Sequence, residues 1–422
     1  MINSNTKRLK CACYSSSVAM AVIGNLPPVL FLTFNRLYGI SYTLLGLLVL
    51  INFVTQLSID LIFSFFSHKF NIPKVVKLMP VITIIGLVIF ASSPYIFPNS
   101  EYIGLSIGTI IFSCAAGLGE VLCSPIVAAL PSKDPDREMS KLHSMYAWGV
   151  VGVIIFSTIF LYLFGEKTWP LLALVFCLLP AFSTYLFLGS DIPELKNEET
   201  TDKISSLFKN KMLWASVLAI FFGGAAEVTM SQWSSGYLEQ ALGIPKVWGD
   251  IFGVALFGLT LGLGRTLYSK IGKNIGRVLT LGGVGAVFCY LTAAVTSNPI
   301  LGLMACGFTG FFTSMLWPGN LIVVADRFPA GGVFIYAMMA AGGDLGASVA
   351  PQLVGIITDF AESSPKLTEI ATNLGLTGNQ FGMKLGMVLG ALFPLMGVIF
   401  YYGFWKSAKN KNKKIRVEKE LK

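Results

Sequence analysis

Three carboxylic acids lie deep inside long apolar segments of this sequence. Glu120, Glu227 and Asp344 each fall near the middle of a run long enough to cross a lipid bilayer. At 1.5 Å per helical residue they lie about 16, 22 and 18 Å from the cytoplasmic ends expected for their helices. A desolvated carboxyl group without a cationic partner favours its neutral form, so it binds and releases a proton as water access changes. These positions predict proton-coupling groups.

A second interpretation stays open for each acid taken alone, namely a protonated carboxyl that hydrogen-bonds a neighbouring helix. No Lys or Arg falls at a comparable depth, so we expect all three carboxyls to lack a basic partner. Asp60 is a fourth acid within an apolar run, but it lies closer to the inner surface.

Amide and aromatic side chains share these runs and could bind a small polar solute such as a sugar. Amides form paired hydrogen bonds with hydroxyl groups, and aromatic faces stack on the C–H surfaces of sugar rings. Each residue also has an ordinary use, because amides bond across helices and aromatic residues pack or mark the membrane interface. The candidate substrate-binding residues are Asn25, Gln56, Tyr146, Trp148, Gln232, Trp233, Trp317, Asn320 and Gln352.

The elements that must position these side chains are membrane-spanning helices. Of the 422 residues, 54% are hydrophobic and 13% are charged, against about 25% charged residues in soluble proteins. Each apolar run has the roughly 20 residues that a helix needs to cross the hydrocarbon core. The expected spans are residues 11–34, 42–66, 75–97, 102–130, 144–165, 169–189, 212–238, 247–269, 276–298, 299–325, 332–360 and 379–404.

The basic residues orient these spans. With a cytoplasmic N-terminus, 26 of the 31 Lys and Arg residues fall in inside segments. The positive-inside rule therefore predicts that both termini are cytoplasmic, in the cell (plasma or inner) membrane. This asymmetry explains the net charge of +9 without nucleic acid. The basic tail, residues 406–422, either meets anionic headgroups or is a solvated stop signal.

The longest inside connection, residues 191–211, divides the chain into six-helix halves, residues 1–190 and 212–405. A weak repeat relates these halves. Gly117 to Pro125 in the fourth span and Gly310 to Pro318 in the tenth have the same Gly-to-Pro spacing. The sequence thus predicts an all-α integral membrane protein with twelve helices in two pseudo-symmetric halves.

Two loops carry a resemblance to a known family. Residues 67–74, with His68 and Lys69, are similar to a degraded loop 2/3 signature of the major facilitator superfamily, and residues 264–273 are closer to that pattern. Glu120 with Pro125, Leu142-His143, and Glu227 with Trp233 and Tyr237-Leu238 resemble fucose-permease-like sugar:proton symporters. An Asn25-Leu26-Pro27-Pro28 segment stands where that family tends to place an acid.

The resemblance implies a central cavity lined by spans other than 3, 6, 9 and 12, and the interior acids all fall on lining spans. It also implies a cytoplasmic charge lock that would stabilise the outward-open state. Asp60, Lys69 and Arg265 are its candidate gating residues, and ordinary positive-inside charge is the alternative. Prolines interrupt several spans as gating hinges or static kinks, namely Pro27-Pro28, Pro125, Pro318 and Pro351.

We therefore expect a secondary active transporter, a proton-coupled symporter of a sugar or similar small polar solute that works by alternating access. Sodium stays open as the coupling ion. The alternative is a proton-coupled antiporter that exports drugs or organic cations. An integral-membrane enzyme or receptor is disfavoured, because no nucleophile elbow, phosphate loop or metal-ligand spacing occurs. We expect a monomer in the lipid bilayer, without cofactor, metal site or disulfide framework.

Overall fold

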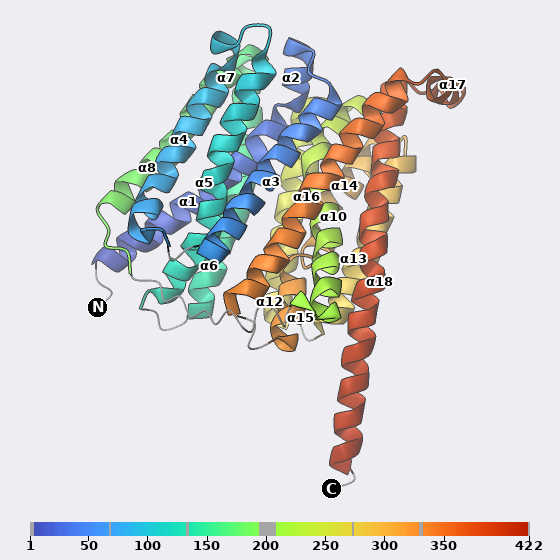
Figure 1. Cartoon of the computed structure of the whole chain (residues 1–422). Helices are drawn as coiled ribbons and strands as arrows, with labels where there is room; N and C mark the ends of the chain where they lie inside the picture. The colour runs from blue at the N-terminus through green and yellow to red at the C-terminus, as the bar shows by residue number, and fades with distance from the viewer. Residues whose placement is uncertain are drawn as a thin grey trace.

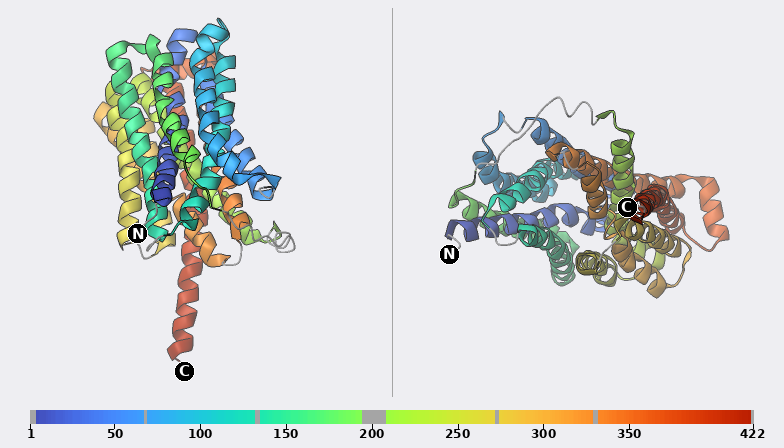
Figure 2. Two further views of the ribbon diagram at one scale, coloured as in Figure 1. Left: turned by 90° about the vertical axis from the view of Figure 1, so that its left-hand side faces the viewer. Right: turned by 90° about the horizontal axis from the view of Figure 1, so that it is seen from below.

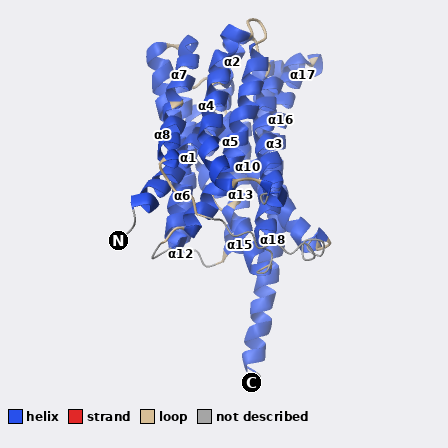
Figure 3. Ribbon diagram, turned by 60° about the vertical axis from the view of Figure 1, so that its left-hand side comes forward, coloured by secondary structure: helices blue, strands red, loops and turns tan. Residues whose placement is uncertain are grey.

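The computed structural model describes residues 4–66, 69–131, 135–193, 208–271, 274–328 and 332–420, and within these ranges it contains helices and no strand (Figure 3). The first half consists of α1 (Ser4–Val29), α2 (Phe31–Tyr38), α3 (Tyr42–Phe66), α4 (Ile72–Ile96), α5 (Glu101–Ala129), α6 (Pro135–Phe164), η2 (Glu166–Thr168), α7 (Trp169–Phe176) and α8 (Leu178–Leu188). The second consists of α10 (Lys211–Leu242), α11 (Lys246–Gly249), η3 (Asp250–Ala255), α12 (Leu256–Ile271), α13 (Ile275–Val295), α14 (Pro299–Thr313), α15 (Pro318–Arg327), α16 (Gly332–Ser363), α17 (Pro365–Asn373) and α18 (Gly378–Glu420).

These helices form twelve spans, as the sequence predicts. Within the described residues, ten segments are long and apolar enough to cross a membrane, and the bent pair α1 and α2 makes an eleventh. The twelfth is α16, whose 32 residues extend about 48 Å at 1.5 Å per residue. The expected all-α fold with two six-helix halves is confirmed.

The two halves lie side by side, with α1 to α8 on one side of Figure 1 and α10 to α18 on the other. Between the halves, α3 packs against α16, and α6 packs against η3 and α12. Small residues allow helices to approach closely in lipid. A Cβ added at Gly355 of α16 would collide with the backbone of Tyr42 in α3, so glycine is needed at this contact.

Prolines break some spans and not others. The axes of α1 and α2 meet at 44°, directly after Pro27 and Pro28. The tenth span is broken between Thr313 and Pro318, whereas α5 runs without a break through Pro125. Pro351 likewise lies inside the continuous helix α16. The repeat seen in the sequence therefore produces a break in only one half.

Both chain termini lie at the same end of the bundle, here called the terminal end, and α18 projects beyond it (Figure 1 and the left panel of Figure 2). The opposite end, here called the far end, holds α2 and α17. Side chains tie the two halves together there. Arg36 contacts both Glu166 and Glu239, and the Asp359 carboxylate accepts hydrogen bonds from the backbone N–H groups of Tyr42 and Thr43 at 3.2 and 2.6 Å.

A third tie at the far end centres on the buried carboxylate of Asp250 in η3. It accepts a hydrogen bond from Thr158 of α6 at 2.9 Å and a salt bridge from Lys246 at 2.7 Å, and it also contacts Ser235. The η3 segment is a single π-helical turn, a distortion often found at functional positions. Here the turn places an acid from one half against a hydroxyl of the other.

Candidate functional site

Three carboxyl groups from both halves meet between α3, α5 and α16. One oxygen each of Asp60, Glu120 and Asp344 lies within 4.8 Å of the others. Asp60 and Asp344 are 2% and 3% exposed, whereas Glu120 is accessible. Gly117 of α5 permits this approach, because a Cβ there would lie 3.0 Å from the backbone oxygen of Gln56 and 3.2 Å from the Asp60 carboxylate. We call this group the carboxyl cluster.

Asp60 was expected nearer the inner surface than the other acids. The structure instead brings its carboxyl to the same level as those of Glu120 and Asp344. Two ionised carboxylates no more than 4.8 Å apart repel each other by at least roughly 3.5 kcal/mol at an effective dielectric constant of about 20. Three such charges cannot all persist in one small volume, so this arrangement requires bound protons or another cation.

The expectation that every deep acid lacks a basic partner is wrong for Glu227. Its Oε1 atom lies 3.0 Å from Nη2 of Arg265 in α12, and the Nε atom of Arg265 donates to the carbonyl oxygen of Ser314 at 3.0 Å. Arg265 lies in the second half of α12, and its long side chain reaches Glu227 of α10. Arg265, which the sequence predicts as a gating residue, forms this ion pair with Glu227.

The sequence explains why α14 offers a carbonyl to Arg265. In a continuous helix the oxygen of residue 314 would accept from the N–H of residue 318, but Pro318 has none. The helix breaks there, and the guanidinium takes the vacated acceptor. Gly264 brings α12 close enough, since a Cβ at this position would lie 2.7 Å from the Ser314 side chain.

Tyr146 of α6 connects the carboxyl cluster to the ion pair. Its hydroxyl lies close to α1, where a Cβ added at Gly24 would be 3.3 Å from it. The charges of Glu120, Glu227 and Arg265 act on this hydroxyl. Gln232 of α10 contacts the same turn of α1, since its Nε2 atom donates a hydrogen bond to the Gly24 carbonyl oxygen at 3.1 Å. Tyr146 and Gln232 thus both approach α1 at Gly24, next to Asn25. We group these three predicted residues with Glu227 and Arg265 and call the five the central polar site.

Trp148 does not belong to this site. It is 62% exposed and shares one face of α6 with three exposed apolar residues, Phe156, Ile159 and Leu163. Two residues apart on a helix differ in direction by about 200°, so Trp148 points away from Tyr146. The apolar stripe faces lipid, and we remove Trp148 from the candidate binding residues.

The other predicted residues lie around the site rather than in it. Gln56 is one turn from Asp60 and donates to Asn52 at 2.9 Å, and Gln352 donates across the halves to the Thr43 carbonyl at 3.2 Å. Trp233 is buried and donates to the Pro351 carbonyl at 3.0 Å, towards the far end.

Two predicted residues of the broken tenth span serve its packing. Trp317 packs against glycines of two other helices, and a Cβ added at these glycines would lie 2.9 Å from its ring at Gly224 and 2.5 Å from it at Gly343. Asn320 is fully buried, and its side-chain nitrogen donates to the Leu316 carbonyl at 2.6 Å. These contacts favour close packing over ligand contact for the glycine-rich segment of α16.

The expected charge lock does not form one group. Asp60 joins the carboxyl cluster, Arg265 pairs with Glu227, and the Lys69 ammonium lies 5.0 Å from the centre of the Phe66 ring. His68 and the basic Lys273 of the second loop lie outside the described residues. In the described part of the chain, three side-chain contacts that join the two halves lie at the far end, and they involve Arg36, Asp359 and Asp250.

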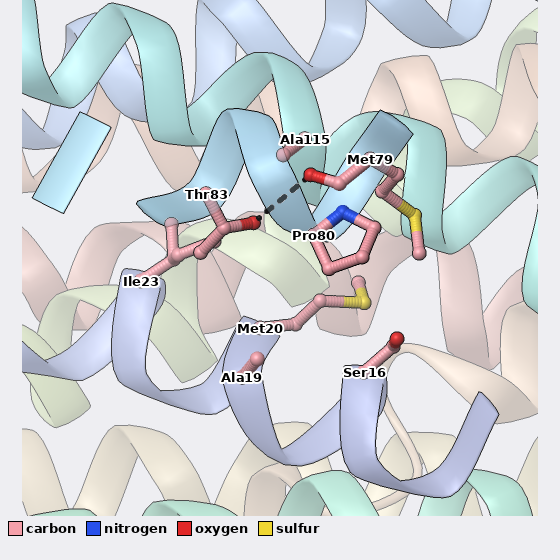
Figure 4. A pocket seen from close by; sticks show the side chains of 8 residues that line it. All are labelled: Ser16, Ala19, Met20, Ile23, Met79, Pro80, Thr83 and Ala115. Carbon is pink, nitrogen blue, oxygen red and sulfur yellow. Dashed lines mark hydrogen bonds between the residues drawn. The ribbon is translucent and has the colours of Figure 1, made fainter. Parts of the chain in front are cut away.

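A small hollow between α1, α4 and α5 is too narrow for a solute. Its volume is about 10 Å³, and it is lined by Ser16, Met20 and the Thr83 hydroxyl, which donates to the Met79 carbonyl (Figure 4). A water molecule needs roughly 10–15 Å³ of such space and several polar partners. This hollow therefore accommodates at most one water and is not a substrate site.

The sequence predicts Glu227 as a deep acid, but it predicts neither the pairing with Arg265 nor the contact of Arg265 with Ser314. The one available signal was the proline at position 318, four residues after Ser314, which predicts a free carbonyl in the tenth span. Nothing in the spacing shows which basic side chain would use it.

Twelve helices in two halves, with polar and acidic side chains at the interface between the halves, define a polytopic membrane transporter. A model of the Major Facilitator Superfamily matches residues 12–351. The chain belongs to this superfamily, which confirms the resemblance seen in its loops. No curated protein sequence matches it.

Solved structures of the same fold cover almost the whole chain. A D-xylose-proton symporter has a TM-score of 0.76 at 14% identity, covering 95% of this chain and 98% of that one. A bacterial homologue of the human lysosomal transporter Spinster, inward-facing and occupied, has 0.71 at 14%, covering 96% and 97%. The E. coli fucose:proton symporter has 0.59 at 13%, covering 93% and 99%. At these identities the likeness supports the fold alone.

Proposed function

We propose that this chain is a proton-coupled symporter of a sugar or similar small polar solute. The observation that supports the proposal best is the carboxyl cluster, because its three acids come from both halves. When the halves close around the carboxyl cluster, the negative charge of Asp344 approaches those of Asp60 and Glu120 unless protons are bound. When the halves separate and water enters, the three carboxylates can all be ionised. Proton binding and the relative position of the halves are therefore coupled.

The central polar site supports a small polar substrate. It combines a carboxylate, a guanidinium, a phenol and two amides, a set that can both donate and accept hydrogen bonds. Its members come from α1 and α6 of the first half and from α10 and α12 of the second. A solute bound there would contact both halves, as alternating access requires. The neighbouring symporters of D-xylose and fucose agree with this class of solute.

The proposal includes an orientation and an assembly state. The terminal end would face the cytoplasm, in the plasma or inner membrane, because the basic residues concentrate there. The halves, residues 1–190 and 212–405, would be the moving units of a monomer, and residues 191–211 the cytoplasmic linker. In this orientation the ties at the far end hold the outer side closed.

The test is uptake of radiolabelled sugars by the purified protein in proteoliposomes with an acidic outside and a neutral inside. We expect the pH gradient to drive sugar uptake. In Glu120→Gln the gradient should lose its effect, while sugar exchange without a gradient continues, since the fixed neutral side chain mimics the protonated state. Glu369→Gln, which changes an exposed acid of α17, is the matched control and should behave as the wild type.

Three results would count against the proposal. Uptake driven by a sodium gradient and not by protons would assign the cluster to sodium. Movement of cationic dyes against the proton gradient, without any response to sugars, would favour the exporter of organic cations. Full coupling in Glu120→Gln would remove the carboxyl cluster from the mechanism.

A further inference from the structure

The Glu227–Arg265 pair leaves two of its hydrogen-bonding atoms, one on each side chain, without a partner among the described residues. Glu227 Oε1 accepts from Arg265 Nη2, and Arg265 Nε donates to Ser314. Glu227 Oε2 is buried without a hydrogen-bond partner. Among the described residues, Arg265 Nη1 likewise makes no hydrogen bond, and the arginine side chain is 31% exposed. The pair thus leaves one acceptor atom and one donor group without a hydrogen-bond partner among the described residues.

The surroundings add a second unused acceptor. Gln232 is 6% exposed, its nitrogen is engaged with Gly24, and its Oε1 is buried without a partner. Tyr146 is 36% exposed and brings a hydroxyl to the same place. A buried acceptor without a donor costs roughly 1–3 kcal/mol. The site therefore gains most from a ligand that supplies hydroxyl donors and also accepts from a guanidinium.

The net charge of the pair indicates which class of ligand could form these hydrogen bonds. The pair is already neutral, so a carboxylate ligand would meet Glu227 at close range, and an ammonium ligand would meet Arg265. Either ion would also lose its hydration on entering the site. Two neighbouring hydroxyl groups carry no charge, and one can donate to Glu227 while the other accepts from Arg265.

We propose that the Glu227–Arg265 pair is the specificity-determining element of the transporter, and that it selects neutral solutes with neighbouring hydroxyl groups over organic anions and cations. This inference rests on the proposed function, because it takes the central polar site as the place where the transported solute binds. It goes further by naming the charge rule and the two residues that impose it.

The test is equilibrium binding to the purified protein, without any gradient, using sugars that differ only in charge. The probes are D-glucose, D-galactose and D-xylose, the amino sugars glucosamine and galactosamine in protonated form, and the ionised acids glucuronate and galacturonate. We expect at least one neutral sugar to bind the wild type more than about 10-fold better than its charged counterparts, a difference of about 1.4 kcal/mol.

The single variants should shift this preference in opposite directions. Glu227→Gln leaves Arg265 uncompensated and should favour the uronates, whereas Arg265→Gln leaves Glu227 uncompensated and should favour the amino sugars. Each shift should again exceed about 10-fold, because an uncompensated charge in a partly buried site attracts the oppositely charged sugar and repels the other. The double variant Glu227→Gln/Arg265→Gln restores neutrality, so it should return to neutral sugars and shows whether folding is kept.

The proposal is overturned if the wild type prefers a charged sugar, if no probe binds, or if both single variants weaken all probes equally. That last result would indicate a structural ion pair. Proton-driven sugar uptake without the charge rule would remove this inference and leave the proposed function intact. If the variants follow the charge rule but a proton gradient has no effect on uptake, this inference stands and the proposed function does not.

Discussion

Asp344 is the one carboxylate that the second half contributes to the cluster, and it predicts a pH dependence. Raising the pH adds negative charge to three groups within 4.8 Å, so the described conformation should lose stability as the pH rises. In Asp344→Asn this loss should shrink by about 1–3 kcal/mol at alkaline pH. Thermal unfolding of the detergent-solubilised protein across a pH series measures it.

The control for this experiment is Glu369→Gln, which should keep the pH dependence of the wild type. Equal pH profiles for Asp344→Asn and the wild type would show that the cluster does not govern the stability of this state.

The sequence predicted which acids lie deep in the bundle, because the position of a residue along its helix sets its depth in the membrane. The acids Glu120, Glu227 and Asp344 lie inside the bundle as expected. The partner of Glu227 could not be found in this way, because depth was assigned from the position of the α-carbon. The backbone of Arg265 lies in the second half of α12, but its side chain extends several ångströms from the backbone and reaches Glu227. The depth of the charge on a long basic side chain therefore cannot be predicted from the position of its backbone.

At the scale of elements, the break between α14 and α15 makes the arginine site possible. Pro318→Ala would supply the missing backbone N–H, which would compete with Arg265 for the Ser314 carbonyl. We expect the thermal stability to change little and the affinity for neutral sugars to fall about 10-fold, because the guanidinium loses a charge-assisted hydrogen bond of about 1.5–3 kcal/mol. The binding measurements described above test this.

Pro351→Ala is the comparison, since Pro351 lies inside a continuous helix. An affinity for neutral sugars that stays unchanged in Pro318→Ala would mean that the Ser314 contact does not position Arg265.

The sequence predicted the number of spans well and their continuity poorly. Hydrophobic length alone identifies a span, because lipid requires an apolar helix of fixed minimum length. Proline marks a possible break without deciding it. Pro125 and Pro318 occupy matching places in the repeat, but only the second begins a new helix. The difference depends on neighbours such as Arg265, which satisfies the freed carbonyl in one half.

At the scale of the whole molecule, the ties at the far end hold the halves closed there. Arg36 joins Glu166 of its own half to Glu239 of the other. Arg36→Gln should shift the population towards a state open at the far end by roughly 1 kcal/mol, since the pair is partly exposed. A cysteine at Leu161, which lines a far-end cavity of about 260 Å³, should then react faster with an impermeant maleimide.

The labelling requires a background from which the seven native cysteines have been removed. Lys167→Gln removes an exposed charge beside Glu166 and serves as the control. No gain in reactivity for Arg36→Gln over that control would show that the other far-end ties are sufficient.

The hydrogen bonds from Tyr42 and Thr43 to Asp359 provide a built-in reporter of the transport cycle. The first N–H groups of a helix have no partner within their own helix, and here the other half supplies it. When the far end opens, these two amides are left to water and their hydrogens exchange with solvent deuterium. Deuterium uptake at residues 42 and 43 therefore measures the fraction of time that the unmodified transporter spends open at that end.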